Sequence, residues 1–329
     1  MTGIFRQKAP GNIVLLFIIG TLTRLPVFAH PHPYVLKDGD GILYTSLIYF
    51  LSGFWGNSAA AFAVFAFGIN MSIAFLLTNF INADRLMLRP NYLSGMAYIL
   101  ITSFLPAFNF LSSSLVASVF LLGAFVLMFR SHNTKINRNY IFNASLLIGL
   151  ASLFFVPSVL FIAWAFLALA LLRPFRFPEW ITLLVGVLTP YYFYAVYLFL
   201  NNHFAIPSYF YHISLFPVKV RFNLWQAGAL FLWLAPLLTG IYYMQALSGK
   251  MMVHVRKGWY LFLWYIIIAL LISLCDMENT TENWILLLAP AAAFHGYGYL
   301  NAEWKLYPKI SFWLAIGFII ASQLYSRLW

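Results

Sequence analysis

Two aspartates separated by a single glycine, Asp38 and Asp40, lie in a short polar segment of a chain that otherwise carries few charges. A carboxylate can act as a general base and take a proton from an acceptor hydroxyl, and two carboxylates together can hold a divalent cation. Gly39 and Gly41 let the backbone turn tightly, so that both carboxylates can face one space. A solvated Asp-Gly turn without a chemical role is the alternative. Asp38 and Asp40 are therefore our candidate catalytic residues, with a possible divalent cation between them.

Further polar side chains crowd into the same segment, just ahead of the aspartates. Only 8% of the whole chain is charged, so this density of polar groups is unusual for the sequence. An arginine, two histidines and a lysine can each contact an anionic substrate. The candidate substrate-binding residues of this segment are Arg24, His30, His32 and Lys37.

A second polar segment, residues 201–223, interleaves aromatic side chains with basic ones. Tyr and Phe can lie at the depth of lipid headgroups while Lys and Arg side chains reach a lipid phosphate. An aromatic belt with charges that extend to water is the alternative. The candidate substrate-binding residues here are His203, His212, Lys219 and Arg221.

A third polar segment is the acidic turn that contains Asp276, Glu278 and Glu282. Its carboxylates can bind a cation or an acceptor, but a solvated loop is the interpretation we favour. Two residues inside apolar stretches also stand out. We expect His295 to form a hydrogen bond between helices, and Pro190 to kink its helix.

The elements that hold these segments must lie in a membrane. Of the 329 residues, 63% are hydrophobic and 8% are charged, whereas soluble proteins carry about 25% charged residues. This composition indicates a polytopic integral membrane protein. A single cysteine, Cys275, excludes an intramolecular disulfide and a cysteine-based metal site, and a buried apolar role is expected for it.

The fold class that we predict is an all-α bundle of about eleven transmembrane helices plus one short juxtamembrane helix. A hydrocarbon core of about 30 Å requires roughly 20 apolar residues for each helix. The predicted spans are 12–28, 58–81, 91–107, 113–129, 140–156, 158–172, 180–200, 224–245, 258–275, 284–300 and 311–326. Residues 41–53 are apolar but too short to span, which fits a helix at the membrane surface. We treat residues 1–329 as one transmembrane domain, with an uncleaved first helix and with loops 29–57 and 201–223 as candidate site loops.

The distribution of basic residues predicts a cytoplasmic N-terminus. With that orientation every Lys and Arg lies on the cytoplasmic side except Arg24, Lys37, Lys219, Arg221 and Arg327. This bias follows the positive-inside rule, and it explains the net charge of +11 without a nucleic-acid partner. Five of the acidic residues fall on the opposite, extracytoplasmic side, namely Asp38, Asp40, Asp276, Glu278 and Glu282. Any chemistry is therefore expected on the outer face.

The layout resembles the GT-C class of integral membrane glycosyltransferases, which use polyprenyl-phosphate sugars. The resemblance rests on Arg24-Leu-Pro at the end of the first helix, on Asp38-Gly-Asp40 in the first outer loop, and on the juxtamembrane segment 41–53. Over its whole length the chain also resembles an uncharacterised family of Bacteroidetes polytopic membrane proteins, which implies no activity. That second resemblance rests on residues 5–10, 176–180 and 188–193.

The GT-C resemblance implies a mechanism. Asp40 or Asp38 would deprotonate an acceptor hydroxyl, which would attack the anomeric carbon of a polyprenyl-phosphate-linked sugar with inversion. Lys219, Arg221 and Arg24 would offset the charge that grows on the departing phosphate. The resemblance also implies a multi-pass protein of the bacterial inner membrane, with membrane lipid as a partner.

Two other classes of function are compatible with the sequence. One is a non-catalytic scaffold or a subunit of a larger envelope complex with partner membrane proteins, which would tolerate the loss of both aspartates. The other is a transporter, which should show ionisable residues deep inside its helices and broken spans in matching halves. Charged residues here lie almost wholly at helix ends, which disfavours transport. No ATP-binding or nucleotide-binding motif is present in the sequence.

Overall fold

The computed structural model describes residues 2–7, 9, 11–31, 34, 36–37, 40–133, 138–201, 223–275 and 281–326. These residues form an all-helical bundle, and two short loop segments are joined by an isolated β-bridge between Asp40 and Phe155. In chain order the α-helices are α1 (Thr2–Phe5), α2 (Gly11–Leu22), α3 (Leu25–Ala29), α4 (Ile42–Trp55), α5 (Ala59–Ala83), α6 (Leu93–Thr102), α7 (Ser113–Arg130), α8 (Arg138–Phe154), α9 (Phe161–Leu172), α10 (Phe177–Leu200), α11 (Leu224–Leu247), α12 (Val253–Cys275), α13 (Ile285–Asn301) and α14 (Tyr307–Ser326). Short 3₁₀ turns between these helices include η1 (Pro106–Asn109), η3 (Val156–Leu160) and η6 (Thr281–Trp284).

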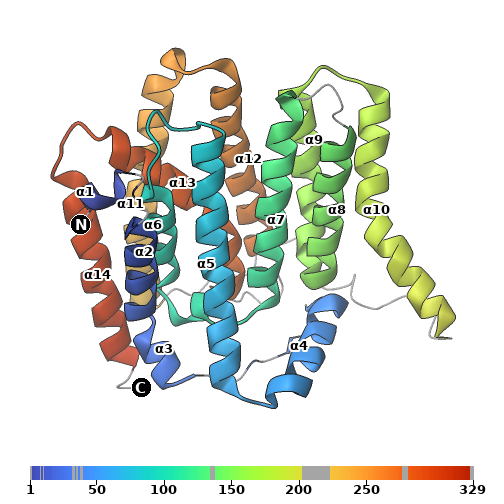
Figure 1. Ribbon diagram of the computed structural model, residues 1–329, viewed down its shortest axis with the longest axis horizontal. Helices are drawn as coiled ribbons and strands as arrows, with labels where there is room; N and C mark the ends of the chain where they lie inside the picture. The colour runs from blue at the N-terminus through green and yellow to red at the C-terminus, as the bar shows by residue number, and fades with distance from the viewer. Residues whose placement is uncertain are drawn as a thin grey trace.

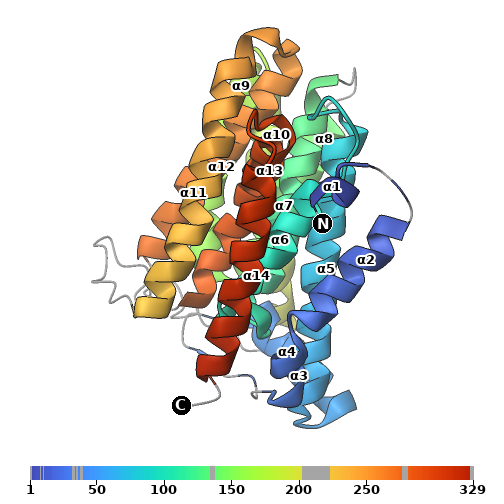
Figure 2. The same ribbon diagram turned by 90° about the vertical axis from the view of Figure 1, so that its left-hand side faces the viewer.

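The long helices run roughly side by side, with α5, α7, α12 and α13 toward the middle and α10 and α14 at opposite edges (Figure 1). Helix α13 is buried from Ile285 to Tyr299 and packs against α6, α11 and α12. Figure 2 shows the same bundle from its α14 side, where α2 and α14 cover α6. A helix buried on all sides is hydrophobic around its whole circumference, which explains the apolar sequence of α13.

Among the described residues, five helices are long and apolar enough to cross a membrane: Ala59–Ala83, Ser113–Arg130, Phe177–Leu200, Leu224–Lys250 and Val253–Leu274. Each of the eleven predicted ranges contains at least part of a helix, so the all-helical membrane architecture is confirmed. How many of these helices cross the membrane, and in which direction, stays a prediction.

Two predicted spans are wrong in detail. The range 12–28 is broken into α2 and α3 at Arg24, because Pro26 at the start of α3 has no N–H to continue the first helix. The range 91–107 holds only the ten-residue α6, followed by η1, which Pro106 initiates. Residues 42–55 do form the predicted short helix, α4, which lies at one end of the bundle (Figure 1).

The two ends of the bundle differ in charge. The α5–α6, α7–α8, α9–α10, α11–α12 and α13–α14 connections lie at one end, and α3, α4 and the C-terminal end of α14 lie at the other (Figure 1). Among the described residues, only Arg24 and Lys37 are basic residues at the α4 end. The remaining described Lys and Arg residues are Arg6, Arg85, Arg89, Arg130, Arg138, Arg173, Arg176, Lys250, Arg256, Lys257, Lys305 and Lys309.

Candidate active site and lipid groove

Asp40 lies at the start of α4, in a turn that the backbone of α8 holds in place. Its backbone N–H donates to the Lys37 carbonyl at 3.1 Å, and its Oδ2 accepts the Lys37 N–H at 2.9 Å. The next N–H, from Gly41, donates to the carbonyl of Phe154 at 2.8 Å. Asp40 is 5% exposed, so its carboxylate is fixed by its neighbours and not free in solvent.

Only glycine fits at position 41. A Cβ atom there would lie 2.1 Å from the carbonyl oxygen of Leu153 and 2.7 Å from the carbonyl carbon of Phe154. Both are backbone atoms of α8, which cannot move aside as the end of a flexible side chain can. The sequence predicted that the glycine permits a tight turn, and the structure adds that it permits close approach to another helix.

Lys37 forms an ion pair with a residue from the far end of the chain. Its Nζ lies 2.7 Å from Oε2 of Glu282, which belongs to η6, and both side chains are half-buried. The sequence favoured a solvated loop for the Glu282 segment, and the pairing corrects that interpretation for Glu282. A separation of 245 positions leaves no spacing signal that could have predicted this contact.

Tyr44, on the first turn of α4, shares the electrostatic environment of these carboxylates. Burial is the largest cause that raises the pKa of its hydroxyl, and the negative charges of Asp40 and Glu282 raise it further. The hydroxyl donates to the carbonyl of Leu111 at 3.0 Å, which ties α4 to the segment before α7. Two carboxylates, a lysine and a buried tyrosine therefore gather at the α4 end of the bundle.

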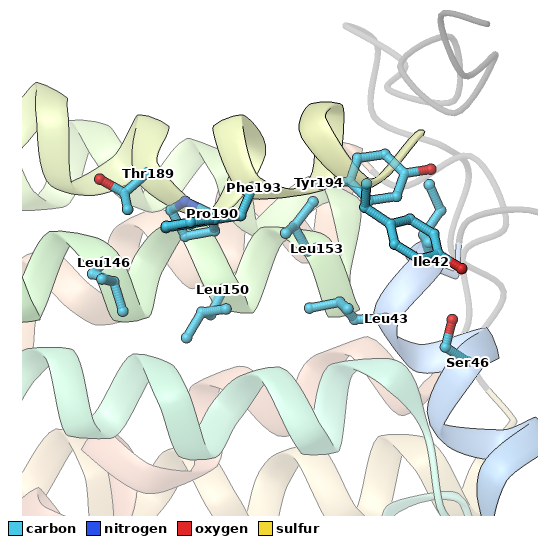
Figure 3. A pocket seen from close by; sticks show the side chains of 11 residues that line it. Ile42, Leu43, Ser46, Leu146, Leu150, Leu153, Thr189, Pro190, Phe193 and Tyr194 are labelled. Atoms are coloured by element: carbon cyan, nitrogen blue, oxygen red, sulfur yellow. The ribbon is translucent and has the colours of Figure 1, made fainter. Parts of the chain in front are cut away.

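An apolar groove of about 520 Å³ begins beside this cluster. It lies between α4, α8 and α10, and Figure 3 shows its wall from Leu146 and Thr189 at one end to Ile42 and Ser46 at the other. The groove is lined by Ile42, Leu43, Ser46, Leu146, Leu150, Leu153, Thr189, Pro190, Phe193, Tyr194 and Tyr197. Asp40 is two residues from Ile42, and its bridge partner Phe155 is two residues from Leu153, so the carboxylate turn adjoins the groove.

Pro190 shapes this groove by ending the close packing of α8 and α10. Up to Pro190 one face of α10 is buried, and a Cβ added to Gly149 of α8 would lie only 2.5 Å from the carbonyl oxygen of Val187. Ser152 and Tyr191 then join the two helices by a hydroxyl–hydroxyl hydrogen bond of 2.6 Å. Beyond this point no residue of α10 is buried, and the helix leans away from the bundle (Figure 1). The predicted kink at Pro190 is consistent with this change of direction.

Arg24 lies apart from the carboxylate cluster, inside the bundle. The guanidinium donates to Asn109 Oδ1 and to Thr102 Oγ1, each at 2.6 Å, and lies over the ring of Phe67 at 5.5 Å. Arg24 is 1% exposed, and among the described residues no carboxylate forms an ion pair with it. The structure therefore does not bring it together with Lys37 and Asp40.

Of the remaining candidate residues, the structure describes His30 alone. His30 is exposed at the end of α3. Asp38, His32, His203, His212, Lys219 and Arg221 lie outside the described residues. Within the described part of the chain, no three His, Cys, Asp or Glu side chains gather into a group that could hold a metal ion.

His295 forms the interhelical hydrogen bond that its position predicted. Its Nε2 lies 2.9 Å from the carbonyl oxygen of Trp233, so α13 is bonded to α11 at this point. The residue is 2% exposed. Its role in the described structure is therefore to join two helices.

The helical fold is similar to that of ArnT from Cupriavidus metallidurans, whose crystal structure contains bound undecaprenyl phosphate. This likeness confirms the GT-C-type fold that the sequence predicted. The TM-score is 0.57 at 10% sequence identity, and the match covers 97% of this chain and 72% of that one. No protein-family model and no curated protein sequence matches the chain. At this level of identity the likeness establishes the fold alone.

Proposed function

We propose that the protein is a GT-C-like glycosyltransferase that moves a sugar from a polyprenyl-phosphate donor to an acceptor at the extracytoplasmic face of the bacterial inner membrane. The observation that carries the proposal is the apolar groove that adjoins a buried carboxylate turn. A prenyl chain needs an apolar surface, and the acceptor needs a base near the sugar-phosphate end of that chain. The similarity to ArnT, which was crystallised with undecaprenyl phosphate, supports a lipid of this kind.

In the proposed reaction, Asp40 takes the proton of the acceptor hydroxyl. The oxygen then forms a bond to the anomeric carbon while the bond from that carbon to the phosphate oxygen breaks, and polyprenyl phosphate leaves with the electron pair. A single displacement of this kind inverts the anomeric centre. The groove between α4, α8 and α10 would hold the first part of the prenyl chain, and Lys219 and Arg221 are proposed to contact the phosphate.

The second aspartate and the cation stay proposals. Asp38 is the alternative base, and with Asp40 it can hold a divalent cation that would bind the phosphate. If such a cation takes part, a chelator should abolish turnover and added Mg²⁺ or Mn²⁺ should restore it. Turnover that is unchanged by the chelator would rule the cation out.

The deciding experiment is sugar transfer by the purified protein from a panel of polyprenyl-phosphate sugars. Asp40→Asn keeps an oxygen that can accept the Lys37 N–H but removes the base, so we expect turnover to fall by about 10²–10⁴-fold while the protein stays folded. Asp38→Asn tests the alternative base in the same assay.

The matched control is Asp84→Asn, because Asp84 also forms polar contacts, with Arg130, but at the opposite end of the bundle. Its turnover should equal that of the wild type. If no donor supports turnover, and Asp38→Asn and Asp40→Asn both retain cellular function, the protein is a scaffold or a subunit of an envelope complex and not a transferase.

A further inference from the structure

The ion pair between Lys37 and Glu282 joins the candidate active-site turn to η6, which lies much later in the sequence. The side chains of Lys37 and Glu282 are 23% and 27% exposed, so the pair is partly shielded from water. Ion pairs that are partly removed from solvent hold a more defined geometry than fully exposed ones, because water and salt compete less with them.

Glu282 is itself held in place by two helices. Its backbone carbonyl accepts a hydrogen bond from Ser114 Oγ of α7 at 3.2 Å. The carbonyl of the next residue, Asn283, accepts a hydrogen bond from Ser273 Oγ of α12, also at 3.2 Å. The η6 turn therefore has fixed attachments to α7 and α12, and the Glu282 carboxylate projects from a rigid support.

Lys37 connects Glu282 to Asp40, because its side chain pairs with Glu282 and its backbone N–H donates to the Asp40 carboxylate. The N–H of Lys37 is a hydrogen-bond donor to the Asp40 carboxylate, so the orientation of the carboxylate depends on where Lys37 lies. On its other side the turn is attached to α8 by the Gly41 N–H. The turn is thus held at two points, by α8 and by Glu282.

We propose that Glu282, acting through Lys37, is a positioning residue for Asp40. This inference rests on the proposed function, in which Asp40 is the base. Glu282 needs no contact with the sugar, the lipid or the acceptor for this role. It keeps the Asp40 carboxylate at the distance and angle that proton transfer requires.

The expected signature is a loss of kcat without a loss of lipid affinity. A displacement of about 1 Å at a catalytic group can cost about 10²-fold in rate, so we expect Glu282→Gln and Lys37→Met each to lower kcat by about 10- to 100-fold. The KM for the lipid donor should stay near that of the wild type, because neither residue lines the groove. The double variant should be no slower than either single variant, because both remove the same interaction.

The exchanged pair distinguishes positioning from direct contact. Lys37→Glu combined with Glu282→Lys restores an ion pair of opposite polarity and should recover most of the lost kcat. If Lys37 instead contacts the substrate phosphate, the exchange places a carboxylate there, and turnover stays lost. Additive single effects, or single variants with wild-type kcat, would equally overturn the proposal.

A proximity measurement separates this inference from the proposed function. Cys275 is the only cysteine, so Cys275→Ser gives a background in which Lys37→Cys and Glu282→Cys can be joined by a short bifunctional thiol reagent. Efficient joining with no turnover by the wild type would refute the transferase and with it the positioning role, although the contact would stand. Failure to join would refute the contact itself, whatever the activity.

Discussion

At the scale of single residues, Arg24 shows how a predicted binding residue can have a structural role. The sequence singled it out as a cation at the end of the first helix, where a phosphate contact was expected. The structure surrounds its guanidinium with an amide oxygen, a hydroxyl and an aromatic ring. A buried cation that donates hydrogen bonds to neighbouring elements joins those elements, here η1 and α6. Substrate binding by Arg24 stays a prediction. The burial of its side chain favours a role in stabilising the fold.

Arg24→Met tests this assignment. It leaves Asn109 and Thr102 without their buried donor, which should cost about 1–3 kcal/mol and lower the Tm of the detergent-solubilised protein. Arg130→Met is the control, because Arg130 is 38% exposed in its pair with Asp84 and such pairs contribute about 0–1 kcal/mol. An unchanged Tm together with lost turnover would instead make Arg24 a substrate-binding residue.

At the scale of elements, the groove is a consequence of how α8 and α10 meet. The helices lie in close contact while Gly149 faces the backbone at Val187, and they separate after the hydrogen bond between Ser152 and Tyr191. Pro190 lacks the N–H that would continue the regular hydrogen-bond pattern, so α10 can change direction there. Helix α4 closes the end of the resulting space, next to Asp40.

Filling the groove should weaken donor binding. Leu150 lines it from α8, and Leu150→Trp would displace part of a bound prenyl chain. The loss of about two buried methylene groups, at about 0.8 kcal/mol each, corresponds to about a tenfold rise in KM for the lipid donor. Leu184→Trp on α10 is the matched control, because Leu184 is 45% exposed and does not line the groove. Equal KM values for the two variants would place the lipid elsewhere.

At the scale of the whole molecule, the unequal charge of the two ends predicts the orientation in the membrane. Nearly all the described basic residues lie at the end opposite α4, and such residues are retained on the cytoplasmic side. We therefore expect Asp40, Lys37 and Glu282 to lie at the extracytoplasmic end. This orientation would allow the reaction to use an acceptor outside the cytoplasm.

Cysteine labelling in whole bacterial cells tests that orientation. In the Cys275→Ser background, Asn57→Cys in the exposed α4–α5 connection should react with a membrane-impermeant maleimide. Leu88→Cys in the α5–α6 connection, where Leu88 is 91% exposed, should react only after the cells are permeabilised. The reverse pattern would invert the topology and place the candidate site in the cytoplasm.

The sequence by itself determined the class of the protein, because composition and the length of apolar runs follow directly from the thickness of a membrane. It also predicted a short helix at 41–53, which the structure has at 42–55, and a kink at Pro190, since each depends on residues that are close together in the chain. Asp40 as the catalytic base stays a prediction. The tertiary structure alone decided that Glu282 pairs with Lys37, that Arg24 is buried among neutral partners, and that α4, α8 and α10 enclose a groove. These contacts join residues that are far apart in sequence, and they depend on how helices pack, which no local pattern of residues encodes.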